Sequence, residues 1–206
     1  VAIVGAGFSG TLLAVQLLTQ TEVGILLIER NVQQVGAGVA YSTDEPLHLL
    51  NVRAGNMSAF PDRPDHFRDW LAERHGGNAS DFASRQIYGD YLRETLIKTA
   101  TRYPGRLKKI DGEVVAAETI DGRLRLLLDD GCEIWPTSLA LTIGNLPPHD
   151  PVSGLRQKLP SHLYLGDPWA APQTTALDTD AHILLIGTGL TTIDVSLRLF
   201  NNGFAG

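Results

Sequence analysis

A glycine-rich turn within the first ten residues limits the folds that this chain can adopt. Val1 to Val4 is an apolar run too short for a helix, and the spacing Gly5-x-Gly7-x-x-Gly10 follows it directly. Thr11 to Leu18 is apolar on all sides, as expected of a helix that is buried against a sheet. Val23 to Ile28 is a second apolar run of strand length. The pattern predicts a β-α-β unit with parallel strands and a right-handed crossover.

Three glycines between a strand and a helix predict a dinucleotide-binding turn. Gly5 permits the tight turn, Gly7 lets backbone N–H groups approach a pyrophosphate, and Gly10 lets the helix pack closely. Glu29 ends the second apolar run, where an acid accepts hydrogen bonds from an adenosine ribose. A bulky residue such as valine at position 7 is predicted to abolish dinucleotide binding and leave the fold intact. The alternative is a glycine-rich turn of an unrelated α/β protein.

A second glycine-rich turn lies near the other end of the sequence. Gly187-x-Gly189-x-x-Thr192 follows the apolar run His182–Ile186 and precedes an apolar helix that extends to Phe200. Thr192 takes the place of the third glycine, so this helix is expected to stand slightly further from its strand. Two such turns in one chain indicate two dinucleotides. The simplest assignment of the two dinucleotides is FAD at the first turn and NAD(P)H at the second.

The region between the two turns is predicted to contain a loop, then two helices, then strands. Residues 36–65 are rich in Gly, Asn, Pro and Asp and predict a loop with short turns. Two helices are predicted over Asp65–Arg74 and Ser84–Thr101. From Gly112 onward, three short strands joined at two Asp-Gly pairs predict an antiparallel meander. Ser138–Ile143 is a further apolar strand, and residues 145–181 form a connector.

These elements predict an α/β fold in two parts. Residues 1–150 form a Rossmann-like FAD-binding domain, with a parallel sheet, the three-stranded meander and a helical insertion at about 60–103. Residues 151–206 form a connector and the incomplete start of an NAD(P)-binding domain.

Composition excludes several other classes of protein. Seventeen basic and 23 acidic residues give a net charge of −6, which argues against a nucleic-acid partner. Cys132 is the single cysteine and forms no internal disulfide, and the six histidines lack metal-ligand spacing, so no metal site is predicted. The apolar start of the chain has no basic leader and is interrupted by glycines. We therefore expect no membrane association and a cytoplasmic location.

The order of the motifs resembles the FAD/NAD(P)-binding family related to class B flavin monooxygenases. That group includes the N-hydroxylating, Baeyer–Villiger and flavin-containing monooxygenases, and the chain resembles a truncated fragment of such a protein. Besides the first turn and Glu29, the resemblance is carried by GAGVAYST (36–43), HLLNVRAGNMS (48–58), SRQIYGDYL (84–92) and LALTIGN (139–145).

The resemblance implies which residues bind the cofactors, although it identifies no general acid or base, so the catalytic residues stay unknown. It places the pyrophosphate on the first turn, the ribose on Glu29 and the adenosine near Arg30. The flavin end is bordered by two loops, the adenine meets the first meander strand, and the strand that returns beneath FAD passes close to it. The implied cofactor-binding residues are Gly5, Ala6, Gly7, Phe8, Ser9, Gly10, Glu29, Arg30, Gly38, Ala40, Tyr41, Asn51, Met57, Ser58, Val114, Val115, Thr142, Gly144, Gly187 and Gly189.

The implied function is that of a flavin-dependent, monooxygenase-like oxidoreductase, in which NAD(P)H reduces bound FAD and a small molecule is the substrate. Baeyer–Villiger oxidation is disfavoured because LYLGDPW (163–169) lacks the histidine of that group's signature. A flavin disulfide reductase is disfavoured because it needs a pair of cysteines. A non-catalytic FAD/NAD-binding sensor or interaction module and a single-cofactor NAD-dependent dehydrogenase stay open as alternatives. The oligomeric state is also open.

Overall fold

The computed structural model describes residues 1–146, 152, 154, 158–160, 163–167, 178 and 180–204. The chain divides into two compact units, Val1–Asn145 and Leu146–Gly206, and each is described by itself. The roles predicted for the two parts, FAD-binding and NAD(P)-binding, stay predictions. Trp169 of the LYLGDPW segment lies outside the described residues.

The first unit is built on a four-stranded parallel sheet, as the β-α-β pattern predicts. The strands lie in the order β3-β2-β1-β7, so the first strand of the chain is central. Ile3 pairs with Leu27 on one side and with Ala140 on the other. The bounds of the strands are Ala2–Val4 (β1), Ile25–Glu29 (β2), Leu107–Asp111 (β3) and Leu139–Leu141 (β7).

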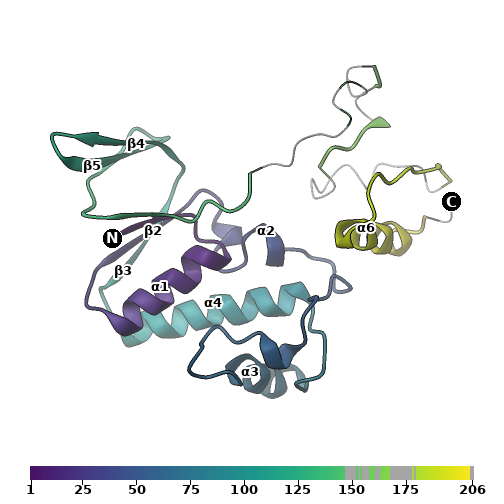
Figure 1. Ribbon diagram of the computed structural model, residues 1–206, viewed down its shortest axis with the longest axis horizontal. Helices are drawn as coiled ribbons and strands as arrows, with labels where there is room; N and C mark the ends of the chain where they lie inside the picture. Colours follow the sequence, from purple (N-terminus) through teal and green to yellow (C-terminus); the bar gives the residue numbers. More distant parts are fainter. Residues whose placement is uncertain are drawn as a thin grey trace. The chain divides into compact units, whose positions relative to one another are not determined.

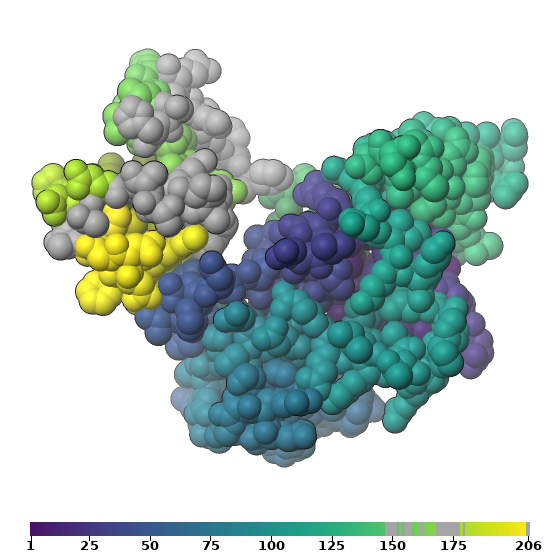
Figure 2. Space-filling view, turned by 180° about the vertical axis from the view of Figure 1, so that it is seen from behind, coloured from purple at the N-terminus to yellow at the C-terminus, as the bar shows by residue number. Residues whose placement is uncertain are grey.

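Helices cover one face of this sheet and the meander covers the other. Ile3 and Leu27 face helices α1 (Phe8–Gln20) and α4 (Arg85–Arg102), which lie side by side in Figure 1. Ala2 and Ile28 face the meander and pack with its Leu126. Adjacent residues of a strand point to opposite faces, so these short apolar strands are buried on both sides. In Figure 2 the purple N-terminal residues lie between the green meander and the blue and teal helical region.

The meander forms as predicted, and its turns show why. Strands β4 (Val114–Ile120), β5 (Arg123–Leu128) and β6 (Glu133–Ile134) pair antiparallel. Asp121 and Gly122 have φ values of 49° and 75°, the left-handed conformation that a two-residue hairpin turn requires at both positions.

The two long predicted helices and the loop are also confirmed. Helix α3 spans His66–His75 and α4 spans Arg85–Arg102, the latter capped by Ser84 Oγ, which accepts a hydrogen bond from Ile87 N–H at 3.2 Å. Residues 36–65 hold only short helical segments: α2 (Gly38–Tyr41), one turn of an α-helix, and the 3-10 turn η2 (Ala54–Asn56). A further 3-10 turn, η1 (Val32–Gln34), follows β2.

Two strand predictions need correction. Strand β3 (Leu107–Asp111) is not predicted, because its Lys108 and Lys109 break the apolar pattern; lysines are tolerated there since β3 is an edge strand. The strand predicted at His182–Ile186 is absent from the described residues. A parallel strand requires a neighbour to bond with, and the described part of the second unit supplies none. Helix α6 (Leu190–Asn201) does form after it.

Glu94 on α4 ties α3 to α4 and gives the first unit a pH-dependent contact. Hydrogen bonds from Lys98, Trp70 and Arg74 lower the pKa of this carboxyl to about 2. A lowered pKa stabilises the fold above the unfolded-state value of 4.5, and this contribution is lost as the pH falls from 4.5 towards 2. We expect Glu94→Gln to remove about 1 kcal/mol at neutral pH, after allowance for partial exposure, and less at pH 3. Urea unfolding at both pH values measures this; an equal loss at both would contradict it.

Candidate dinucleotide-binding site

The first glycine-rich turn connects β1 to α1 and passes very close to β7. Gly5 has φ +94°, and a Cβ there would collide with the carbonyl group of Thr142. A Cβ on Gly10 would collide with the Gly5 carbonyl oxygen and lie 2.6 Å from Thr142 Oγ1. That hydroxyl donates to the carbonyl oxygens of Val4 (3.0 Å) and Gly5 (2.6 Å). The need for glycine at positions 5 and 10 therefore has a steric basis in Thr142, which directly follows β7, and in the carbonyl of the turn itself.

Gly7 lies against the backbone of Gly38, a contact that the sequence pattern does not predict. A Cβ on Gly7 would lie 3.2 Å from the Cα of Gly38, and a Cβ on Gly38 would lie 3.4 Å from Phe8 N. Gly36 N–H donates to the Ala6 carbonyl at 2.8 Å, which joins the two glycine-rich segments. Close contact between these segments, in addition to any approach of a pyrophosphate, therefore requires a small residue at position 7.

The N-terminus of α1 is open to an anionic ligand. Its N-cap is Gly7, no side chain caps it, and its first turn holds no acid. The first helical hydrogen bond runs from Thr11 N–H to the Gly7 carbonyl, so the N–H groups of Phe8, Ser9 and Gly10 precede it. Helix α4, by contrast, carries a serine cap. An uncapped helix start surrounded by glycine is the arrangement that binds phosphate groups.

Glu29 reaches back from the end of β2 to the turn. Its Oε2 accepts a hydrogen bond from Ala6 N–H at 2.7 Å, and its Oε1 accepts one from Asn31 N–H at 3.1 Å. An ionised carboxylate offers about four acceptor positions. Glu29 can therefore hold the turn and still accept hydrogen bonds from two ribose hydroxyls.

Arg30 links the end of β2 to the start of the meander. Its Nη1 lies 2.8 Å from Glu113 Oε1, and Gly112 N–H donates to the Glu29 carbonyl at 3.1 Å. Val114 is half-buried against Leu126, whereas Val115 is 57% exposed. The structure thus brings the residues expected at the adenosine, Glu29, Arg30 and Val114, to neighbouring ends of β2 and β4.

The loop expected at the flavin end begins beside the first turn. The Tyr41 ring contacts Phe8 (centroids 5.7 Å apart) and Tyr88 (4.9 Å), and burial raises the pKa of Tyr41. Gly89 of α4 allows this packing, because a Cβ there would lie 2.6 Å from the Tyr41 carbonyl oxygen. Ala40 and Asn51 are exposed, and so is Gly144, which has φ +76°.

Met57 and Ser58 lie deeper in the helical layer. Met57 packs against the main core, and Ser58 Oγ donates to the carbonyls of Phe60 and Arg63. The next residue, Ala59, donates its N–H to Tyr91 Oη at 3.1 Å and its carbonyl lies 3.5 Å from Gln16 Nε2. Gln16 is in the third turn of α1, so the residue after Ser58 contacts the middle of this helix, and the expected place of Ser58 at the flavin end stays a prediction.

The second turn repeats several features of the first. Gly187 has φ +121°, and Gly189 is the N-cap of α6, again without a side-chain cap. Thr192 Oγ1 donates to the Gly187 carbonyl at 2.7 Å. In the first turn the equivalent carbonyl, that of Gly5, accepts a hydrogen bond from the hydroxyl of Thr142, the residue that directly follows β7. The hydroxyl that donates to the first glycine's carbonyl therefore comes from the helix itself in the second turn, and from a residue outside the turn and its helix in the first.

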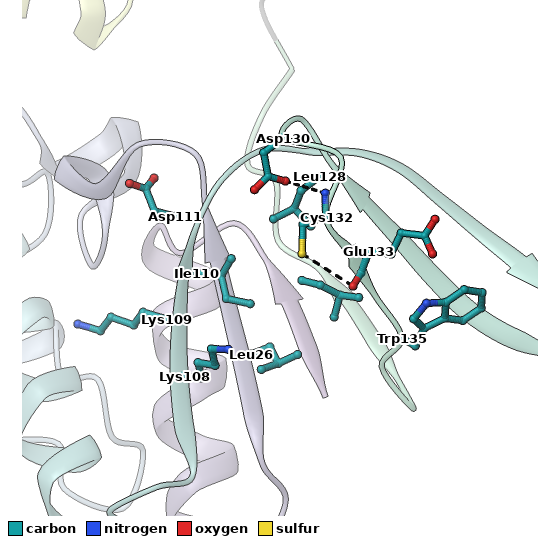
Figure 3. Close-up of a pocket in the computed structure, with 11 residues that line it drawn as sticks. Leu26, Lys108, Lys109, Ile110, Asp111, Leu128, Asp130, Cys132, Glu133 and Trp135 are labelled. Atoms are coloured by element: carbon teal, nitrogen blue, oxygen red, sulfur yellow. Dashed lines mark hydrogen bonds between the residues drawn. The ribbon is translucent and has the colours of Figure 1, made fainter.

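Two surface grooves lie near β3 and neither includes the glycine-rich turn. The larger, of about 480 Å³, separates β3 from the β5–β6 hairpin (Figure 3). Its apolar walls include Ile110 and Trp135, and Cys132 Sγ lies at its side, 3.9 Å from the Glu133 carbonyl. The smaller, of about 390 Å³, lies between η1 and α4. Both are open hollows beside the sheet edge, and the predicted site residues do not line them.

Several residues that shape the site are not among those predicted for it. They are Gly36, Gly89, Glu113 and Arg93, whose Nε donates to the Val35 carbonyl at 3.1 Å and so holds the segment before α2. Gly36 and Gly89 lie in motifs that carry the family resemblance, so the sequence could have indicated their importance. Glu113 has no such signal, because its partner Arg30 is far away in the sequence.

Residues 2–146 match the FAD-NAD(P)-binding family. This is most of the chain, and the chain belongs to that family. The predicted fold class is confirmed, and FAD and NAD(P), the predicted cofactors, are the nucleotides that define the family. No curated protein matches the chain.

Several solved structures are similar to this chain at low sequence identity. A closed structure of cyclohexanone monooxygenase is 18% identical, with a TM-score of 0.52, over 71% of this chain and 26% of the other. A thioredoxin reductase TrxB from Bacillus anthracis is 14% identical, with a TM-score of 0.42, over 73% of this chain and 39% of the other. OTEMO in complex with FAD and NADP is 17% identical, with a TM-score of 0.47, over 70% and 25%. The chain thus spans well under half the length of these proteins.

Within the described part of the chain, every helix is too short or too polar to cross a membrane.

Proposed function

We propose that the first unit binds FAD and serves a flavin-dependent oxidoreductase of the monooxygenase type, in which NAD(P)H is the reductant and a small molecule is the substrate. The observation that carries this proposal is the uncapped start of α1, enclosed by Gly5, Gly7 and Gly10, with Glu29 at the end of the neighbouring strand. The family match and the fold shared with cyclohexanone monooxygenase support it.

The residues of the first unit fit the adenosine diphosphate half of FAD. Backbone N–H groups at the start of α1 would hold the pyrophosphate, because the helix dipole and the unbonded donors both favour negative charge. Glu29 would accept hydrogen bonds from the ribose hydroxyls while it keeps Ala6 in place. Thr142 fixes the carbonyl of Gly5 and so holds the turn in shape.

FAD, when bound, supplies the ability to accept hydride from NAD(P)H and to react with oxygen. The part of the protein in this process is to orient the cofactor and to exclude water. Asn51, exposed after the buried Leu50, would border the flavin end. Gly187 and Gly189 would hold the pyrophosphate of NAD(P)H at the uncapped start of α6.

The visible absorption spectrum of the full chain, recorded after mixing with FAD and removal of free cofactor, tests the proposal. Retained flavin absorption that bleaches on addition of NAD(P)H is the expected result. Retained flavin that NAD(P)H does not bleach would favour a non-catalytic FAD-binding module. Failure to retain FAD, together with calorimetric binding of NAD⁺, would instead favour a nicotinamide site at the first turn.

Gly7→Val is expected to weaken FAD binding about tenfold to a hundredfold while the protein stays folded, a smaller effect than the full loss that the sequence pattern predicts, because the Cβ meets the Gly38 backbone at 3.2 Å and not closer. A side chain at position 7 meets the backbone of Gly38 and displaces either α2 or the start of α1 from the pyrophosphate. Titration of FAD by calorimetry measures the affinity, and circular dichroism checks the fold. Gly24→Val is the matched control, because a Cβ on Gly24 has no neighbour within 4 Å. Unchanged FAD affinity in Gly7→Val would mean that the site lies elsewhere.

A further inference from the structure

The end of the sheet where the adenosine ribose is expected is rich in carboxylates. Glu29 ends β2 and is in register with Asp111, the last residue of β3. Glu113 follows two residues later, and its N–H donates to Asp129 Oδ1 at 3.1 Å. In Figure 3, Asp111 and Asp130 lie at one end of the groove between β3 and the β5–β6 hairpin. A ribose that carries a phosphate would therefore meet negative charge here.

Arg30 is the residue that could offset this charge. It directly follows Glu29, and an arginine near the ribose is what accommodates a 2′-phosphate in dinucleotide sites. Its guanidinium is instead held 2.8 Å from Glu113 Oε1. Both side chains are largely exposed, 69% for Arg30 and 48% for Glu113, so the pair adds little stability. The ion pair affects the binding of an anion more than it affects stability. Glu113 occupies the guanidinium of Arg30, and its own negative charge repels phosphate.

We propose that Glu113 is a specificity-determining residue, which makes the first site prefer an adenosine with a free ribose 2′-hydroxyl over one with a 2′-phosphate. The inference rests on the proposed function, since it assumes that adenosine binds beside Glu29. FAD carries a free 2′-hydroxyl at this ribose, and NADP(H) carries a phosphate there. Glu113 would thus keep NADP(H) out of the site that FAD needs, although both molecules share the same adenosine and pyrophosphate.

Competition against FAD tests this inference. The full chain is loaded with FAD, and NAD⁺ or NADP⁺, which differ only in the 2′-phosphate, is titrated in while displaced FAD is followed by its fluorescence. The ratio of the two inhibition constants reports discrimination at the first site alone. For the unaltered chain, NADP⁺ is expected to be the weaker competitor. Glu113→Gln, which removes the charge and keeps the shape, is expected to improve NADP⁺ relative to NAD⁺ about fivefold.

Two further variants separate the role of Glu113 from a general charge effect. Glu118→Gln removes an acid of β4 that pairs with Arg125, and it is expected to leave the ratio unchanged. Arg30→Gln combined with Glu113→Gln is expected to lose much of the gain, because the freed guanidinium is its main source. An unchanged ratio in Glu113→Gln, with normal FAD affinity, would overturn the inference and leave the proposed function standing. Absence of FAD binding in the unaltered chain would instead overturn the proposed function.

Discussion

Gly10→Ala is expected to lower the free energy of unfolding of the first unit by about 3 kcal/mol and to abolish FAD binding. The added methyl group has no space: it collides with the carbonyl oxygen of Gly5 and lies 2.6 Å from Thr142 Oγ1. Both neighbours are fixed, since the Gly5 carbonyl belongs to the turn and the Thr142 hydroxyl is bonded to it. Helix α1 must therefore move away from β1 and β7, which opens the site. Urea unfolding followed by circular dichroism measures the change.

Helix propensity and the steric collision predict changes of opposite sign in the free energy of unfolding of Gly10→Ala, so the experiment distinguishes them. Gly10 lies within α1, and helix propensity alone predicts that alanine would stabilise the protein by up to about 1 kcal/mol. Gly24→Ala is the control for a glycine with open space around it, and it is expected to change stability by less than about 0.5 kcal/mol. A Gly10→Ala variant as stable as the unaltered protein would show that the turn and the helix are further apart than described.

Arg106→Met is expected to lower the free energy of unfolding by about 2–3 kcal/mol, because it removes the cap of α1. The largely buried guanidinium donates to the carbonyls of Leu18 (3.0 Å), Thr21 (2.6 Å) and Val23 (3.0 Å). Its backbone carbonyl also accepts the N–H of Ile25 at 2.7 Å, so it joins the end of α1 to the starts of β2 and β3. Methionine keeps the length of the side chain and leaves these carbonyls without their donor.

Arg106→Lys is expected to recover only part of the loss, since an ammonium group cannot match the fork of donors that guanidinium offers. Arg102→Met provides the matched control: Arg102 is exposed in the last turn of α4, and we expect it to change stability by less than about 0.5 kcal/mol. Chemical unfolding of the three variants measures this. Equal stability of Arg106→Met and Arg102→Met would contradict the capping role.

The local elements were predictable from sequence because neighbouring residues encode them. The β1-turn-α1-β2 unit follows from two apolar runs and three glycines. The hairpin follows from the pair Asp121-Gly122, because these residue types readily adopt the left-handed φ that the structure shows at both positions. The strand expected at His182–Ile186 shows the limit of such reasoning. A run of apolar residues is compatible with a strand, but the strand exists only where another strand bonds to it.

Spacing and turn chemistry act over a few residues, and they are enough to predict a parallel α/β core, a meander and two glycine-rich turns. The surroundings of the site instead depend on tertiary contacts: Gly7 against Gly38, Thr142 bonded to Gly5, Glu29 bonded to Ala6 and Arg30 paired with Glu113. Each of these contacts joins different elements of the fold. Their geometry depends on how the strands and loops are placed in space, which no local pattern specifies.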